Sequence, residues 1–307
     1  MKNTPGSDKI DVKLWWQFTR PFSFNAAYTP VLIGSILAYT VERSHFRVLI
    51  FLAMFIASVM IQAATNLFNE YYDFEKGLDT AESVGIGGAF THHHIKPNQV
   101  LTFAVVLYSI ALLLGIYICF SSSWWLALVG GVCMAVGYLY TGGPRPIAYT
   151  PLSEVTSGLF MGSVIICTAY FIQTGSITLN IFLVAIPTTL FISNILLTNN
   201  IRDLTEDTGV GRKTLPIILG RKKAITLQAT VFCTGYTMLL ILPIIGATSY
   251  WVWLALASSV NAYSSVKGLI GKSAPAEMMP AMGAAVNNNK HFGLLLTIGI
   301  FFGTLSL

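Results

Sequence analysis

Two short acidic stretches, each at the end of a long apolar run, hold most of the residues of this chain that could do chemistry. Both contain the pattern Asn-x-x-x-Asp, as Asn69 with Asp73 and as Asn199 with Asp203. Residues four apart share one face of a helix, so each pair presents an amide and a carboxylate to the same side. The two copies lie 130 positions apart (69 to 199 and 73 to 203), which suggests two similar halves.

The acids of these stretches need a positive partner, because clustered carboxylates repel one another and are costly to desolvate in a lipid-rich protein. Eight of the thirteen acids belong to this group: Glu70, Asp73, Glu75, Asp79, Glu82, Asp203, Glu206 and Asp207. Oxygen ligands suit Mg²⁺, which binds few carboxylates and completes its shell with water and substrate phosphates. We therefore predict a magnesium-diphosphate site, with these ligands from the two stretches: Asn69, Asp73, Asn199, Asp203 and Asp207. The alternative is a set of hydrated loop acids that bind nothing.

Basic residues are interleaved with the acids, as diphosphate binding requires. Arg202 precedes Asp203 directly, and Lys213 follows the second stretch. Arg145 lies in a Gly-Pro-rich loop, and Arg20 precedes the first long apolar run. Arg and Lys can neutralise phosphate oxygens directly while the acids act through a metal. Each of them could instead be an anchor that fixes the orientation of the chain in a membrane.

A diphosphate ester in a lipid-accessible cavity would carry an isoprenoid tail. Its ionisation leaves an allylic carbocation, which aromatic faces stabilise and water destroys. Aromatic residues near the required depth either serve this purpose or pack: Phe68, Tyr71, Tyr72, Tyr138 and Tyr140. Glu154 begins a predicted span and could face the substrate or simply favour the helix N-terminus. The run His92–His94 indicates a solvated loop, because consecutive side chains cannot all point at one ion.

The elements that must position these residues are membrane helices. Of the 307 residues, 54% are hydrophobic and only 10% are charged, whereas a soluble domain carries about a quarter charged residues. Apolar periodicity predicts nine helices, so we expect an all-α polytopic membrane protein and a single domain over residues 1–307. Their approximate ranges are 22–42, 48–69, 99–119, 124–140, 153–173, 178–200, 223–244, 248–269 and 291–306. Nothing in the chain suggests a nucleic-acid partner.

The basic residues predict how the chain lies in the membrane. If the loops alternate between sides, sixteen of the eighteen Lys and Arg fall on one side, and only Arg43 and Arg47 fall on the other. Cytoplasmic loops carry the excess of basic residues in membrane proteins. We therefore expect a multi-pass protein of the cell membrane, with its N-terminus and both acidic loops in the cytoplasm.

Several stretches resemble motifs of the UbiA-type intramembrane aromatic prenyltransferases, and the similarity runs from Arg20-Pro21 to the final apolar run. The stretches that carry it are 66–73, 76–79, 140–144, 199–203 and 212–215. The resemblance implies about nine membrane helices around a central cavity, with cytoplasmic caps that carry the two Asp-rich motifs, 66–79 and 199–214. It also implies Mg²⁺-dependent transfer of a polyprenyl group from its diphosphate to an aromatic acid.

Within the family, the resemblance is to the branch that prenylates 1,4-dihydroxy-2-naphthoate with loss of the ring carboxylate as CO₂, which gives demethylmenaquinone. It implies that Asp73, Asp203 and Asp207 are catalytic and that the metal ligands are Asn69, Asp73, Asp79, Asn199, Asp203 and Asp207. The residues expected to meet the diphosphate are Arg20, Arg145, Arg202 and Lys213. We expect further substrate contacts from Asn66, Tyr72, Tyr140 and Glu154.

The chain departs from the family pattern in two places, and the acceptor stays open. The first motif of the family often has the spacing Asp-x-x-x-Asp, but here position 77 is glycine and the next acid is Asp79. The stretch 83–90 lacks an Arg that many relatives carry. The acceptor could also be 4-hydroxybenzoate or homogentisate. A cation-coupled transporter is the non-enzymatic alternative, but it would place acids near mid-span instead of at helix ends.

Overall fold

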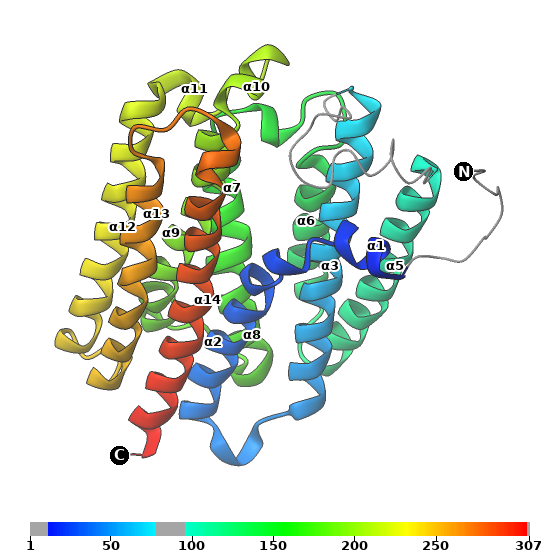
Figure 1. Cartoon of the computed structure of the whole chain (residues 1–307). Coiled ribbons are helices and arrows are strands. Elements are labelled where there is room, and N and C mark those ends of the chain that lie inside the picture. Colours follow the sequence, from blue (N-terminus) through cyan, green and yellow to red (C-terminus); the bar gives the residue numbers. More distant parts are fainter. Residues whose placement is uncertain (1–11, 78–95, 306–307) are drawn as a thin grey trace.

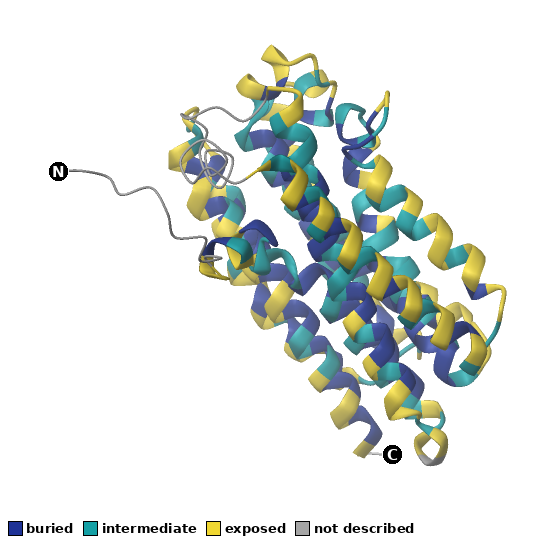
Figure 2. Ribbon diagram, turned by 90° about the vertical axis from the view of Figure 1, so that its right-hand side faces the viewer, coloured by how far each residue is buried: buried dark blue, intermediate teal, exposed yellow. Residues whose placement is uncertain are grey.

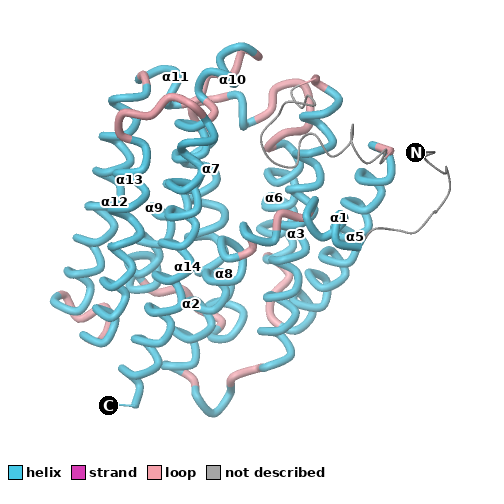
Figure 3. The backbone as a smooth tube through the Cα atoms, in the orientation of Figure 1, coloured by secondary structure: helices cyan, strands magenta, loops and turns pink. Residues whose placement is uncertain are grey.

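The computed structural model describes residues 12–77 and 96–305, which form helices joined by loops, with no strand among them (Figure 3). In chain order, with η for 3₁₀ and π helices, they are α1 (Val12–Phe18), η1 (Pro21–Ser23), α2 (Asn25–Val41), η2 (Arg43–His45), α3 (Val48–Glu75), α5 (Pro97–Ser121), α6 (Leu126–Leu139), η3 (Ile147–Tyr149), α7 (Ser153–Gly158), η4 (Leu159–Val164), α8 (Ile165–Thr174), α9 (Leu179–Arg202), α10 (Leu204–Gly209), α11 (Leu215–Leu219), α12 (Arg221–Ile244), η5 (Tyr250–Ser258), α13 (Ser259–Leu269) and α14 (Pro275–Leu305).

The long helices run side by side between two ends of the molecule (Figure 1). Helix α3 packs along α5, whereas α2 packs on α8 and α14, and α9 packs on α12 and α14. The carboxyl end of α3 and the short helix α10, which follows α9, lie at the same end of the bundle (Figure 1). The carboxyl end of α14 lies at the opposite end. The bundle therefore brings the helix ends that carry the two acidic stretches to one end of the molecule.

Six segments of the described chain are long and apolar enough to cross a membrane: Pro21–Val41, Val48–Glu75, Pro97–Ser121, Ser153–Thr174, Leu179–Arg202 and Arg221–Ile244. Each coincides with a predicted span, and the chain is a multi-span membrane protein, as its composition predicted. The other three predicted spans fall on α6, on η5 with α13, and on α14, which are shorter or more polar. The total of nine spans stays a prediction.

The last helix differs from the prediction. We expected a span over residues 291–306, but α14 already begins at Pro275 and is 31 residues long. Lys290 was one of the sixteen basic residues that we assigned to the cytoplasmic side as loop residues. It lies inside this helix with an exposed side chain, so its assignment to a loop was wrong. The polar run before residue 291 suggested a loop, yet it is helical.

Two asparagines explain why this polar run is helical. Asn289 of α14 donates from Nδ2 to Oδ1 of Asn25 in α2 over 2.8 Å. Tyr236 of α12 donates its hydroxyl to Oδ1 of Asn288 over 2.6 Å. Both amides are fully buried. Burial of an amide is costly without a partner, and amides that bond between helices strengthen packing inside a membrane.

The largest core cluster lies around Phe191 of α9. Its ring meets that of Phe292 of α14 edge to face, with 4.6 Å between centroids, and that of Tyr236 at 4.9 Å. A Cβ atom at Gly235 of α12 would lie 2.4 Å from the Phe191 ring, so α9 and α12 approach closely only because that residue has no side chain. Buried residues face inward along the helices, and exposed ones face outward (Figure 2).

Arg47 connects helix ends at the side opposite the acidic stretches. Its guanidinium donates to the carbonyl oxygen of Ser121, the last residue of α5, over 2.6 Å, and to that of Ile172 in α8. Its backbone N–H donates to Oε1 of Gln173 over 2.9 Å. The last carbonyls of a helix lack partners within the helix and carry partial negative charge, so a cation there is stabilising.

Candidate active site

The first acidic stretch occupies the carboxyl end of α3. Asn69 accepts a hydrogen bond at Oδ1 from the Thr141 hydroxyl over 2.7 Å. Asp73, one turn further on, has a side chain that is 19% exposed. Asn66, one turn earlier, donates from Nδ2 to the carbonyl oxygen of Thr19 over 2.7 Å and to the Ser23 hydroxyl over 2.9 Å. Asn66 therefore fixes the segment before α2 against α3, whereas Asn69 and Asp73 lie at the end of the helix.

The second acidic stretch lies where α9 ends and α10 begins. Arg202 donates from Nε and Nη2 to the two carboxylate oxygens of Asp203, each over 2.6 Å. Its Nη2 also donates to Oδ1 of Asn199 over 2.8 Å. The Asp203 backbone N–H donates to the Asn199 carbonyl over 3.0 Å, which closes the last turn of the helix. One guanidinium thus orients both side chains of the second Asn-x-x-x-Asp pair.

A second basic residue, Arg212, joins the two stretches. Its Nη2 lies 3.1 Å from Oδ1 of Asp73, and its Nη1 lies 2.9 Å from Oδ1 of Asp207. The two acids are 134 positions apart, since 207 minus 73 is 134. Burial raises the pKa of Asp207 to about 6, although the Arg212 guanidinium opposes that rise. The two distant acidic stretches therefore share one site.

Arg20 belongs to the same end of the bundle. Its guanidinium forms an ion pair with Glu70 of α3, with Nη2 2.5 Å and Nε 2.7 Å from Oε1. Glu70 is fully buried, whereas the Arg20 side chain is 33% exposed and lines a cavity. The backbone of Arg20 has φ of 50°, a left-handed conformation that is uncommon for residues other than glycine.

Aromatic rings surround the basic residues at this end. The ammonium of Lys76 lies 5.0 Å from the centroid of the Tyr149 ring, and the guanidinium carbon of Arg212 lies 5.1 Å from it. Contacts of this length between a cation and a ring face are attractive. The hydroxyls of Tyr72 and Tyr138 lie 2.6 Å apart, so part of the hydrogen-bonding capacity of Tyr72 is used within the protein.

Glu154 contacts the helix α9 next to the second acidic stretch. Its Oε1 accepts a hydrogen bond from Nδ2 of Asn200 over 2.8 Å, and its Oε2 accepts one from the Ser153 hydroxyl over 2.9 Å. The residue is 3% exposed. Asn200 is the neighbour of Asn199 on α9, so Glu154 connects the start of α7 to the end of the helix that carries the second stretch.

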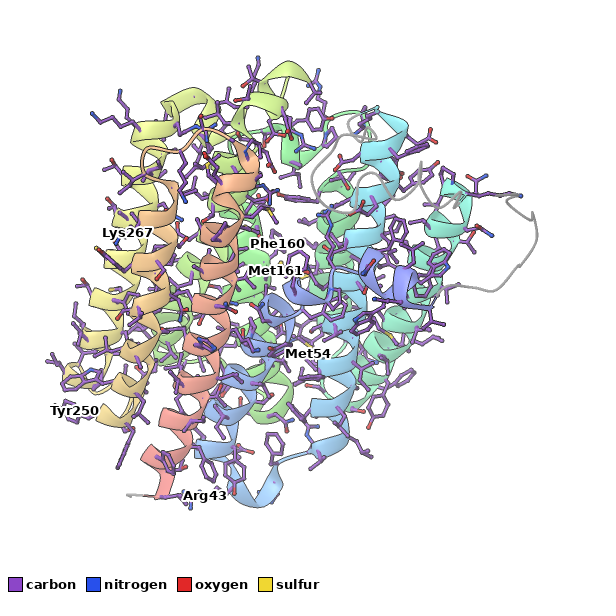
Figure 4. All side chains as sticks on the ribbon, in the orientation of Figure 1. Arg43, Met54, Phe160, Met161, Tyr250 and Lys267 are labelled. Atoms are coloured by element: carbon purple, nitrogen blue, oxygen red, sulfur yellow. The ribbon has the colours of Figure 1, made fainter. Side chains whose placement is uncertain are left out.

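A cavity of about 410 Å³ extends along α6, from Tyr140 after its carboxyl end to Leu126 at its start. Arg20, Asn69 and Asn199 line its polar end. Its deeper wall is apolar and includes side chains in the middle of the bundle (Figure 4): Met54, Phe160 and Met161. The cavity therefore joins a charged end to an apolar interior.

Phe160 and Met161 belong to the π-helical segment η4, in which the turn is wider than in an α-helix. Gly158, which precedes this segment, and Gly162, which lies within it, allow it to pack against α9. A Cβ atom at Gly158 would clash with the Ser193 hydroxyl, and one at Gly162 would lie 2.6 Å from the Thr189 hydroxyl. Single π turns inside helices are frequent at functional sites. Here the segment supplies two side chains to the cavity wall.

Some predicted site residues contribute little in this structure or lie outside the described residues. Asp79 lies outside the described residues, as does the run His92–His94, for which we predicted a solvated loop. Arg145 and Lys213 are described and have exposed side chains. Within residues 12–77 and 96–305, no three His, Cys, Asp or Glu side chains are close enough to hold a metal ion, so a metal there would also need the amide oxygens of Asn69 and Asn199.

The sequence placed Arg212 among the basic residues beside the second stretch but did not assign it to the site, and it gave no role to Thr141. The run Gly211-Arg212-Lys213-Thr214 stands next to the second stretch, but its spacing does not say which of two adjacent basic residues faces the acids. In the structure, a backbone hydrogen bond decides which of the two side chains faces the acids. Lys213 donates its N–H to the Tyr149 carbonyl over 2.9 Å, and this turns the preceding side chain toward Asp73 and Asp207.

Comparison with known proteins identifies the family. The profile of the UbiA prenyltransferase family matches residues 27–279, which is most of the chain. The chain belongs to the UbiA prenyltransferase family. This confirms the resemblance that the two Asp-rich motifs indicated, and it confirms an enzyme that transfers prenyl groups.

Relatives with the activity or the domain of this family in their names cover most of the chain. A 1,4-dihydroxy-2-naphthoate octaprenyltransferase of Bacillus subtilis (strain 168) is 49% identical over 288 residues, 94% of this chain and 92% of the relative. The UbiA prenyltransferase domain-containing protein 1 of Danio rerio is 34% identical over 240 residues, 77% of this chain and 69% of the relative.

A solved structure supports the predicted UbiA-like fold. It is that of a UbiA homolog from Archaeoglobus fulgidus bound to DMAPP and Mg²⁺, which superposes with a TM-score of 0.65 and covers 92% of this chain and 99% of that one. At 12% identity the likeness concerns the fold alone. The prediction of an all-helical UbiA-like membrane fold is confirmed.

Proposed function

We propose that this protein transfers a polyprenyl group from a polyprenyl diphosphate to 1,4-dihydroxy-2-naphthoate, with loss of CO₂ and diphosphate, to give demethylmenaquinol, the reduced form of demethylmenaquinone. The observation that carries the proposal is that Arg212 pairs with both Asp-rich motifs, whose Asn69 and Asn199 line the polar end of an apolar cavity. The 49% identity to a naphthoate octaprenyltransferase supports this choice of acceptor. In the reaction, the carbon–oxygen bond to diphosphate breaks, a carbon–carbon bond forms on the ring, and the ring carboxylate leaves.

The residues of the two motifs fit a divalent metal. Oxygen donors come from two helix ends: Asn69, Asp73, Asn199, Asp203 and Asp207, with Asp79 as a further candidate. One oxygen of Asp207, Oδ2, is buried and has no hydrogen-bond partner among the described residues, as expected for a ligand atom. Mg²⁺ favours such ligands, and when bound it would neutralise negative charge that develops on the departing diphosphate.

Basic residues at the same end would hold the diphosphate. Arg20 lines the cavity, and Arg202 lies beside the second motif, so both can meet phosphate oxygens there. Arg145 and Lys213 are exposed at the same end and would add charge from loops. Preorganised cations lower the energy of a leaving diphosphate because they need no rearrangement as its charge grows.

The apolar part of the cavity would take the start of the prenyl chain and exclude water from the reacting carbon. Phe160 from η4 and Tyr140 after α6 present aromatic groups to this space. Aromatic faces stabilise an allylic cation, and a dry cavity prevents its capture by water. We assign Tyr140 to the substrate side. Asn66, Tyr72 and Glu154 act through their contacts with Thr19, Tyr138 and Asn200.

The same reasoning gives the placement of the chain. We propose that residues 1–307 form a single membrane domain of the cell membrane, with the Asp-rich end in the cytoplasm, where soluble substrates arrive. The excess of basic residues on that side supports this orientation.

The deciding experiment supplies membranes that contain the protein with labelled polyprenyl diphosphate and separate aromatic acids. We expect a labelled prenylated product from 1,4-dihydroxy-2-naphthoate, and labelled CO₂ in a parallel reaction whose naphthoate carries the label at its carboxyl carbon. The parallel reactions contain 4-hydroxybenzoate and homogentisate. Product from either of these, with the naphthoate unchanged, would assign the protein to a different acceptor.

A further inference from the structure

Arg212 pairs with acids from two stretches that are far apart in the sequence. It is the only side chain in the described part of the chain that forms ion pairs with both Asp-rich motifs, with Asp73 at 3.1 Å and with Asp207 at 2.9 Å. Its side chain is 15% exposed, so the contact is largely removed from water. The ion pairs of Arg20 and Arg202, in contrast, each involve one motif only.

The loop around Arg212 is built to keep the guanidinium in place. Gly211 has φ of 78°, a left-handed conformation that allows the chain to turn back after α10. The Arg212 backbone N–H then donates to the Asp207 carbonyl over 3.0 Å. The guanidinium lies against the Tyr149 ring, 5.1 Å from its centroid. Backbone and ring contacts therefore place the cation between the two motifs.

A cation is needed between these two acids. Two carboxylates that face each other in a poorly hydrated site repel strongly, and this repulsion would separate α3 from the α9–α10 corner. Asp73 and Asp207 are also candidate metal ligands, and each accepts a hydrogen bond from Arg212 at Oδ1. Oδ2 of Asp207 is buried and unpartnered among the described residues. Arg212 thus binds one oxygen of each carboxylate that could otherwise bind a metal ion.

We infer that Arg212 is a resident counter-cation: it holds Asp73 and Asp207 together in the metal-free protein and releases their carboxylates when diphosphate arrives to pair with its guanidinium. This inference rests on the proposed function. It makes metal binding conditional on the substrate, because a divalent ion alone must compete with Arg212, whereas a diphosphate removes the competitor. By linkage, diphosphate and metal each strengthen the binding of the other.

The test measures metal binding, not turnover, on the full-length protein in detergent. Mn²⁺ serves as the probe, because oxygen-rich magnesium sites accept it. Calorimetric titration with Mn²⁺ alone gives an apparent Kd for wild type and for Arg212→Gln. We expect Arg212→Gln to bind Mn²⁺ alone about tenfold more tightly, on the scale of effects seen when residues around a metal site change. A residue that merely supports the fold would give weaker metal binding when it is removed.

Two further variants keep the result interpretable. Lys222→Gln removes one positive charge from an exposed site on α12 and should leave the Kd for Mn²⁺ unchanged, which controls for net charge. Tyr149→Leu removes the ring beneath the guanidinium but keeps Arg212, and it should also tighten binding of Mn²⁺ alone. It provides the test if Arg212→Gln does not fold. Equal Mn²⁺ affinity in wild type, Arg212→Gln and Tyr149→Leu overturns the inference.

A second measurement separates this inference from the proposed function. The thermal midpoint, followed by tryptophan fluorescence, is recorded with Mn²⁺, with inorganic diphosphate and with both. Wild type should be stabilised by the pair well beyond the sum of the single additions, and Arg212→Gln should lose most of this excess. If the pair stabilises wild type while Mn²⁺ alone already binds as tightly as in the variant, only the role of Arg212 fails. If no combination stabilises any form, the metal-diphosphate site itself fails.

Discussion

Glu70 and Arg20 form an ion pair whose two members differ sharply in their access to water. The Glu70 carboxylate is fully buried, whereas the Arg20 side chain is 33% exposed. Oε2 of Glu70 has no hydrogen-bond partner in the described part of the chain. The carboxylate therefore depends on Arg20 for its compensation, while Arg20 retains contact with solvent. The pair connects the segment before α2 to the middle of the first Asp-rich motif.

This asymmetry predicts unequal effects on stability. Arg20→Ala leaves a buried carboxylate without its cation and should destabilise the protein by about 3 kcal/mol. Glu70→Gln leaves a cation that water can reach, and it should cost about 1 kcal/mol. The double variant should recover most of the loss caused by Arg20→Ala. Thermal unfolding in detergent measures all three. A double variant as unstable as Arg20→Ala would show that the buried charge is not the cause.

The metal ligands can be tested by removing one charge from each motif. Asp73→Asn and Asp203→Asn should each lower the rate of prenyl transfer by about 100-fold or more, because stabilisation of the leaving diphosphate is lost. Both variants should stay folded, since Asn keeps the shape and one oxygen. Glu206→Gln changes an exposed neighbour in α10; it is the control and should retain full activity.

The need for a metal can be tested by chelation. EDTA should abolish prenyl transfer by the wild-type protein, and added Mg²⁺ should restore it. A rate of prenyl transfer that EDTA does not change would contradict a metal site.

Glu154 can be assigned by comparing two substitutions. If it positions the second motif through Asn200, Glu154→Ala should lower kcat about 10- to 100-fold, the range found for residues that orient metal ligands. Glu154→Gln, which can keep a hydrogen bond to Asn200, should restore most of that loss. Steady-state kinetics with both substrates measures this. Equal loss in the two variants, with a raised KM for the aromatic acid, would instead indicate that the charge meets the substrate.

The sequence was sufficient for the features that depend on local pattern. Apolar runs gave the six long spans, because a helix that crosses a membrane must be apolar over most of its length. The acidic stretches marked the ends of α3 and α9, because carboxylates do not continue into lipid. The i, i+4 spacing of Asn69 and Asp73 placed both on one face of a helix end, where the structure has them.

Features that depend on partners distant in sequence could not be predicted. The start of α14 was missed because Asn288 and Asn289 are tolerated in a buried helix only through Tyr236 and Asn25, which belong to other helices. Lys213 was assigned to the site in place of Arg212 for a similar reason. The conformation of the loop decides whether Arg212 or Lys213 points inward. The amino-acid composition of the loop does not predict that conformation.

The close approach of α2 to α8 leads us to expect opposite effects for two glycine substitutions. A Cβ atom at Gly34 of α2 would lie 2.3 Å from the carbonyl oxygen of Ile166 and 2.9 Å from Cβ of Ala169, so α2 and α8 would have to separate. Gly34→Ala should therefore destabilise the protein by about 1–3 kcal/mol. At Gly130 of α6 no atom lies within 4 Å of the added Cβ, and an alanine there should stabilise the helix by about 0.5–1 kcal/mol. Thermal midpoints in the same detergent compare the two variants. Similar shifts of the same sign would mean that the small residue in α2 is not what allows the two helices to approach.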